Sequence, residues 1–116
     1  MEFKKTSVVS TPEILKRKLG GELFVPVTID EDAFTNGVVK AGTPINADGE
    51  IAETTTAEGV STNDAVGILL NDVYAENPNG SLIKAFATIN SDVAEEWADV
   101  EYDDALKSAL PNIVFE

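Results

Sequence analysis

The chain of 116 residues contains no cysteine and no histidine. Without cysteine it can form no disulfide bond and offers no thiolate nucleophile. Without histidine it lacks the commonest general base and the commonest transition-metal ligand. The usual zinc sites, which are built largely from these two residue types, are therefore excluded.

Long apolar runs are also missing, and aromatic residues are few. No stretch approaches the ~20 apolar residues of a membrane-spanning helix, and no apolar leader is visible near the first methionine. We therefore expect no membrane partner and a protein that is made in a cytoplasm. The one Trp, two Tyr and five Phe are scattered along the chain.

Positive charge is scarce, and most of it lies near the N-terminus. Residues 1–20 hold five basic and two acidic side chains, a net charge of +3, whereas residues 21–116 hold three basic and 19 acidic ones, a net charge of −16. Such an acidic body repels phosphates, so we expect no nucleic acid partner. The chain is expected to divide into an N-terminal arm, residues 1–22, and a body, residues 23–116. The arm is either a solvated tail or a segment that becomes ordered on a partner.

The body is typical of short strands separated by turns. The most apolar run, AVGILLNDV at 65–73, is expected to be a central strand, and 57–64 is expected to be a loop. In the strand expected at 81–89, alternate residues should face the core. These residues are Ile83, Ala85, Ala87 and Ile89. The other expected strands are 24–29, 37–45, 50–56 and 112–116.

Residues 90–111 have a helical composition that contrasts with the strands before them. Asp92, with Glu95 three residues later, has the spacing of a capping box. Asp103 or Asp104 is expected to cap a second short helical segment, which ends at Pro111. The sequence therefore predicts a mainly β fold, a small β-barrel or sandwich, with a short helical insertion before the last strand.

The arm has a helix-start signal of its own. Thr11 can act as an N-cap with Pro12 at the first helical position. The following ILKRKL, residues 14–19, would give about two turns, and Gly20-Gly21 would end them.

The stretch PINADGEI, residues 44–51, copies the centre of a calcium-binding EF-hand loop in Asn46, Asp48 and Gly49. In that register the first ligand position is Pro44 and the twelfth is Thr55, and neither can supply the required carboxylate. Asp-Gly is one of the best pairs for a hairpin turn. The stretch is therefore interpreted as a turn between strands 37–45 and 50–56, and no metal site is predicted.

Acidic residues gather at 92–104, but neither a cleft nor an aromatic lining accompanies them in the sequence. A solvated helix face or a weak surface cation site accounts for them better than paired catalytic carboxylates do. No nucleophile motif or phosphate-binding glycine spacing occurs. We therefore expect no enzyme activity, no catalytic residue and no cofactor.

Three stretches are similar to a known family. The segment GVVKAGTPI at 37–45, the turn at Asp48-Gly49 and DAVGILLNDV at 64–73 resemble head decoration proteins of tailed bacteriophages, most closely the head-fibre type. The lambda-type decoration proteins share the AVGIL element, and the closing ALKSALPNIVF at 105–115 is similar to the ends of such chains. The resemblance covers about residues 35–116.

The resemblance implies a small, β-tulip-like domain that forms homotrimers on the outer surface of the virion capsid. It also implies an N-terminal arm that docks on the major capsid protein and stabilises the expanded head. A donated strand gains main-chain hydrogen bonds while its side chains fill pockets, and basic residues would complement an acidic shell. The capsid-binding residues expected in the arm are Phe3, Lys4, Lys5, Val8, Val9, Lys16, Arg17 and Lys18.

One alternative is a small β-rich module of a phage tail or fibre that binds carbohydrate or a host surface. It predicts an exposed aromatic patch around Trp97 and Tyr102. Packing of Trp97 against the core is the competing interpretation of that residue, since Val93 lies four positions earlier on the predicted helix.

Overall fold

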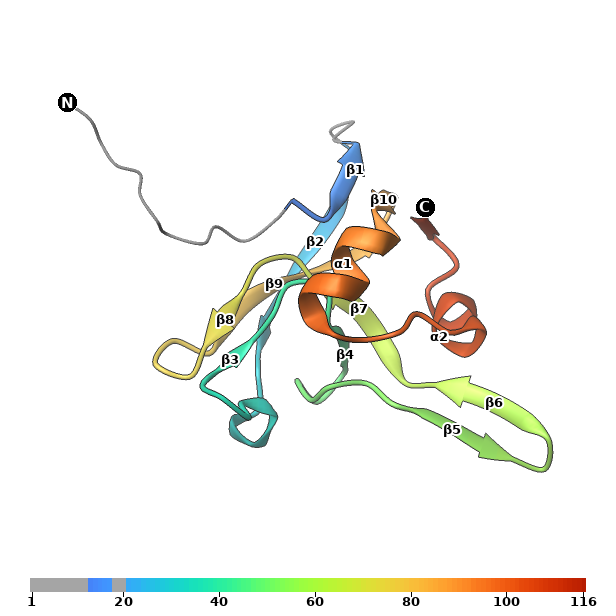
Figure 1. The fold of residues 1–116 in the computed structure, drawn as a ribbon, viewed down its shortest axis with the longest axis horizontal. Coiled ribbons are helices and arrows are strands. Elements are labelled where there is room, and N and C mark those ends of the chain that lie inside the picture. The colour runs from blue at the N-terminus through green and yellow to red at the C-terminus, as the bar shows by residue number, and fades with distance from the viewer. Residues whose placement is uncertain (1–12, 18–20) are drawn as a thin grey trace.

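The structure is a computed structural model that describes residues 13–17 and 21–116. The predicted mainly β fold is confirmed, but the described strands form separate sheets and no closed barrel (Figure 1). In chain order the elements are β1 (Leu15–Arg17), β2 (Leu23–Thr28), the 3-10 helix η1 (Glu31–Ala33), β3 (Val38–Val39), β4 (Pro44–Asn46), β5 (Thr54–Ala57), β6 (Val60–Asn63), β7 (Ala65–Leu69), β8 (Val73–Tyr74), β9 (Asn79–Ala85), β10 (Ala87–Ile89), α1 (Ser91–Ala98), α2 (Asp104–Ala109) and β11 (Ile113–Phe115).

The largest sheet is antiparallel and has the order β2-β9-β7-β4. β7 lies inside this sheet, as predicted for the apolar run at 65–73. Its adjacent residues Ile68 and Leu69 are both fully buried and belong to different apolar clusters. Because successive side chains of a strand point to opposite faces, the sheet is covered on both faces. This double cover explains why the run is continuously apolar rather than alternating.

The strand predicted at 81–89 is divided in two at Phe86. β9 belongs to the largest sheet, whereas β10 joins β1 and β11 in a second one. Phe86 has a φ of 61°, which is rare for a bulky residue, and its N–H donates to the carbonyl of Asn112 at 2.7 Å. The core face predicted for 81–89 is confirmed, since all four of its residues are buried: Ile83, Ala85, Ala87 and Ile89.

The second sheet has the order β1-β10-β11, with β1 antiparallel and β11 parallel to β10. The helix predicted over ILKRKL is therefore wrong for Leu15–Arg17, which form an edge strand. Ile14 and Leu15 are buried in the core, and this burial, with the pairing to β10, outweighs a weak local helix signal. Residues 13–17 of the predicted arm thus pack with the body, whereas the predicted helix start at Thr11 and Pro12 lies outside the described residues.

Two small antiparallel pairs differ from the sequence-based prediction. β5 and β6 form a hairpin where 57–64 was expected to be a loop. The strand expected at 37–45 is broken into β3, which pairs with β8, and β4, which pairs with β7. A turn with Gly42 at a φ of 96° separates them. A side chain at Gly42 would meet the backbone of Ala94, so the turn allows the chain to pass close to α1.

The helical insertion is confirmed as two short helices, α1 and α2. Asn90, not Asp92, caps α1, because the Asn90 side chain accepts from the N–H of Val93. Asp103 caps α2 as predicted, accepting from the N–H of Leu106 at 2.9 Å. Ala94 of α1 and Leu106 of α2 are buried in the same apolar cluster as Ile68, so both helices cover one face of the largest sheet. No helix among the described residues is long and apolar enough to cross a membrane.

Candidate functional site

The stretch PINADGEI forms a tight turn closed by Asn46. Its side-chain Oδ1 accepts from the N–H of Asp48 at 2.9 Å and from the N–H of Glu50 at 3.0 Å. Gly49 has a φ of 81°, which suits the predicted Asp-Gly turn. The predicted pairing across the turn is confirmed only for one antiparallel bridge, between Ile45 and Ile51. The longer pairing of β4 is with β7.

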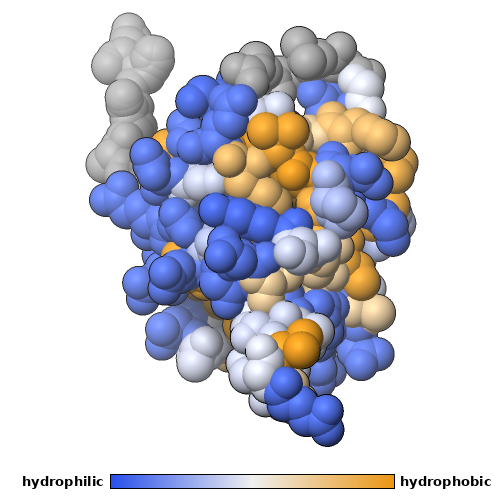
Figure 2. Space-filling model, turned by 90° about the vertical axis from the view of Figure 1, so that its right-hand side faces the viewer, coloured by the Kyte–Doolittle hydropathy of each residue, from blue (hydrophilic) through white to orange (hydrophobic). Residues whose placement is uncertain are grey.

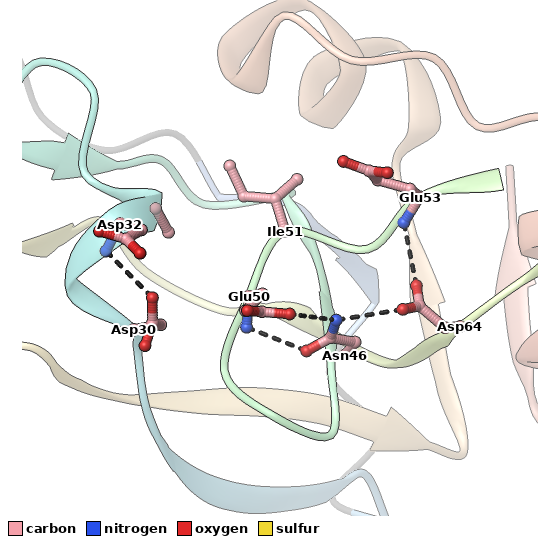
Figure 3. Close-up of a pocket in the computed structure, with 8 residues that line it drawn as sticks. Asp30, Asp32, Asn46, Glu50, Ile51, Glu53 and Asp64 are labelled. Carbon is pink, nitrogen blue, oxygen red and sulfur yellow. Dashed lines mark hydrogen bonds between the residues drawn. The ribbon is translucent and has the colours of Figure 1, made fainter.

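An acidic hollow lies beside this turn. Five of the eight residues that line it carry carboxylates (Figure 3): Asp30, Asp32, Glu50, Glu53 and Asp64. Asn46 sits among them, with its Nδ2 donating to Glu50 at 3.3 Å and to Asp64 at 3.1 Å. Glu53 and Asp64 are also joined, because the N–H of Glu53 donates to Asp64 at 2.9 Å.

The carboxylates that have defined contacts in this hollow accept hydrogen bonds from the backbone or from the Asn46 side chain. Asp30 accepts from the N–H of Asp32 and so caps η1. The pKa of Asp64 is lowered, first by the hydrogen bond from the N–H of Glu53 and also by the bond from Asn46. Within residues 13–17 and 21–116, no group of acidic side chains is arranged to hold a metal ion. These contacts make the hollow part of the turn structure.

Asp64 and Asp103 hold the base of the β5–β6 hairpin, and both have a lowered pKa. That of Asp103 is lowered mainly by the N–H of Leu106 and then by the hydroxyl of Thr54, which donates to it at 2.7 Å. A carboxyl with a lowered folded-state pKa stabilises the fold above its ordinary pKa of 3.8, and this contribution is lost as the pH falls through the folded-state value.

Acidification should therefore loosen the hairpin base before the protein unfolds. We expect amide protection factors at Glu53 and Leu106 to fall as the pH is lowered below 3.8, the ordinary carboxyl pKa, and the two carboxylates take up protons. Hydrogen exchange measured by NMR tests this. In Asp64→Asn, the pH dependence at Glu53 should disappear while that at Leu106 remains. Protection factors that stay constant over this range would contradict the assignment.

Trp97 and Tyr102 do not form an exposed aromatic patch. Tyr102 is only 4% exposed, and its hydroxyl donates to the carbonyl of Gly42 at 2.6 Å. Burial, with the nearby charge of Glu95, raises the Tyr102 pKa above its ordinary range. Trp97 is half-buried against the core, as the competing interpretation proposed. The aromatic patch predicted for a carbohydrate-binding module is therefore incorrect.

The Trp97 ring also makes two polar contacts. Its Nε1 donates to Oδ1 of Asp72 at 2.8 Å, and Nζ of Lys40 lies 4.8 Å from the ring centroid. The same Asp72 oxygen accepts from the N–H of Ala41 at 2.8 Å. Asp72 thus ties α1 to the turn that follows β3.

An apolar groove lies where β9 passes into β10, facing the end of α2. Its lining includes Leu23, Val66, Phe86 and Pro111, with Lys84 beside them. Phe86 is 66% exposed and Leu23 is 43% exposed. Figure 2, which views the molecule from the side of α2, shows hydrophobic side chains gathered in the upper half among hydrophilic ones. An exposed aromatic side chain held in a left-handed conformation is a feature of functional sites, so this groove is a candidate interaction surface.

The predicted capsid-binding residues are only partly described. Lys16 is exposed on β1, with its Nζ 3.6 Å from Glu116, and Arg17 pairs with Thr88. The other six lie outside the described residues: Phe3, Lys4, Lys5, Val8, Val9 and Lys18. The sequence did not predict the groove, although it did place Phe86 on the face opposite the core residues.

Comparisons with protein-family models, with curated proteins and with solved structures found no match.

Proposed function

We propose that this chain is a capsid decoration protein, a cement protein that binds the outer surface of an expanded phage head. The observation that carries the proposal is the junction between the basic N-terminal arm and the acidic body. Residues 1–12 lead directly into β1, and Ile14 and Leu15 immediately after them are buried in the core. A partner that holds the arm is thereby linked to the folded body through β1.

The distribution of charge supports docking through the arm. Lys4 and Lys5 precede a body with a net charge of −16 over residues 21–116. Opposite charges on the arm and on an acidic shell surface would speed association and orient it. The acidic body would meanwhile remain in solvent, since it repels both a like-charged shell and other copies away from a defined contact.

The apolar groove at Phe86 supports the second part of the proposal, which is association of the copies into a homotrimer. Exposed aromatic side chains in such hollows are common anchors of interfaces. Lys84, one of three basic residues in the acidic body, lies in the groove lining. Its charge favours an acidic partner surface, and a neighbouring copy provides one.

Cementing follows from binding that is selective for one state of the shell. If each trimer bridges capsid subunits that lie at the correct spacing only after expansion, then its binding free energy stabilises only the expanded shell. Such a protein stabilises the shell by binding alone.

Deleting residues 1–12 is expected to abolish attachment to expanded heads. The deletion leaves β1 intact, so the truncated protein should retain its circular dichroism spectrum and thermal midpoint. Co-sedimentation with undecorated, expanded heads built from the major capsid protein of the same phage measures attachment. A control with Lys107→Gln, which removes one exposed positive charge on α2, should bind like the parent chain.

The two outcomes of this experiment are distinct. Loss of co-sedimentation on deletion, with the body still folded, supports docking through the arm. A parent chain that fails to sediment with expanded heads at any ratio would overturn the proposal.

A further inference from the structure

The β5–β6 hairpin projects from the body without a sheet to cover it. In Figure 1 it extends away from the other strands, at the end of the molecule opposite β1. Every residue of β5 is exposed, and Val60 of β6 is 61% exposed. A two-stranded hairpin that is largely exposed is marginally stable by itself. The hairpin would therefore be stabilised by a third strand.

The outer edge of β5 is open among the described residues. β5 pairs with β6 alone, whereas α2 lies beside β6. In an antiparallel strand, alternate main-chain N–H and C=O groups point away from the paired neighbour. Those of β5 can therefore accept an added strand.

The hairpin is also nearly free of charge, unlike the rest of the body. Between Thr54 and Asn63 the single charged side chain is Glu58, and it lies in the turn, with a φ of 53°. Cross-strand contacts join the hydroxyls of Thr56 and Ser61 at 2.8 Å. In Figure 2 the lower end of the molecule, where Figure 1 places the hairpin, carries pale and orange groups above a blue tip. An uncharged strand can approach this edge without electrostatic repulsion.

One segment of the chain has the matching character. Residues 6–11, TSVVST, are uncharged and rich in β-branched residues, which favour strands. This segment lies outside the described residues and ends only three positions before Ile14. Three residues span at most ~10 Å, whereas β1 and the hairpin lie at opposite ends of the fold (Figure 1). Because Ile14 is buried in the core, Thr11 stays near β1, so pairing of the whole segment with the hairpin is assigned to a neighbouring copy.

We propose that residues 6–11 of one copy pair with the outer edge of β5 in a neighbouring copy. The contact joins different surfaces of the two chains, so repetition closes a ring or links copies into a chain. It goes beyond capsid docking, because it gives the arm a partner that is present without any shell. The basic residues Lys4 and Lys5 would then lie next to the hairpin, on a neighbour with a strongly acidic body.

Cross-linking between singly substituted chains tests the pairing, and the absence of native cysteine makes the labelling selective. Equal amounts of Val8→Cys and Thr55→Cys proteins are mixed and treated with a short bismaleimide. The control replaces Thr55→Cys with Tyr74→Cys, at a side chain that is 53% exposed on β8. Because pairing raises the local concentration of the two thiols, we expect about tenfold more of the Val8→Cys/Thr55→Cys heterodimer than of the control heterodimer.

Proline substitutions distinguish strand pairing from general contact. Val9→Pro removes an N–H from the added strand, so in the Val8→Cys chain it should lower the yield to that of the Tyr74→Cys control. Glu2→Pro, which lies outside residues 6–11, should leave the yield unchanged. Equal yields at Thr55→Cys and Tyr74→Cys would overturn the proposal. So would a cross-link that forms within single chains of the Val8→Cys/Thr55→Cys double variant at high dilution.

This result is separable from that of the capsid experiment. If heads still lose the protein when residues 1–12 are deleted but no preferential cross-link forms, the arm binds the shell and strand donation between copies is wrong. If the cross-link forms and the parent chain does not bind heads, the capsid proposal fails while strand donation stands.

Discussion

Replacing Gly49 with alanine is expected to destabilise the protein by about 3 kcal/mol. Alanine disfavours the left-handed backbone conformation at this position, and its Cβ would clash with a neighbouring segment. Gly49 has a φ of 81°, and a Cβ added there would clash with the carbonyl oxygen of Thr28. That oxygen belongs to the main chain at the end of β2, so it cannot rotate away as a side chain would. The N–H of Asp30 also donates to the Gly49 carbonyl at 2.8 Å, which holds the two segments together.

Gly37→Ala is the matched control for this prediction. Gly37 has a similar φ of 79°, but a Cβ there would meet nothing within 4 Å. Its replacement should therefore carry only the conformational cost, about 1 kcal/mol. Urea unfolding of both variants measures the difference. Equal losses of stability would show that the contact with Thr28 is unimportant.

Replacing Asp72 with alanine is expected to lower the free energy of unfolding by about 2–3 kcal/mol, because hydrogen bonds to a charged group are strong and their donors would lose a partner. The two donors are the N–H of Ala41 and the Nε1 of Trp97, each 2.8 Å from the same carboxylate oxygen. Loss of these two hydrogen bonds should release α1 from the turn after β3.

The chain has a single tryptophan, so fluorescence reports directly on this contact. In Asp72→Ala the emission of Trp97 should move to longer wavelength as the ring gains water. Asp72→Asn keeps an oxygen that can accept both hydrogen bonds, so it should retain most of the stability and most of the parent spectrum. An unchanged spectrum in Asp72→Ala, together with equal stability of the two variants, would contradict this role.

The sequence predicted those parts of the fold that depend on local pattern. The buried strand β7, the core face of 81–89 and the cap at Asp103 all follow from residues close to one another in the chain. The β5–β6 hairpin was missed because its turn is Glu58-Gly59. Both residues have positive φ, as an Asn-Gly or Asp-Gly turn would, but glutamate is not among the residues that signal such a turn.

Long-range contacts account for the other errors in the fold. Residues 15–17 form a strand only because β10 is there to pair with them, and a local helix signal carries no information about that partner. The candidate site was predictable to a smaller extent. Alternation placed Phe86 away from the core, but its left-handed φ and the groove beside it depend on where Asn112 and Pro111 lie in space.

The position of β1 has a consequence for how the chain folds as it is made. Leu15 pairs with Ile89, so the first described strand has no partner until more than 70 further residues have been synthesised. At about 5–20 residues per second, the ribosome takes about 4–15 seconds to add them. During that time the apolar side chains of Ile14 and Leu15 remain unburied beside the basic arm. We expect β1 to become anchored only in the last stage of folding, so a partner bound near the N-terminus of a nascent chain would not yet be linked to a folded body.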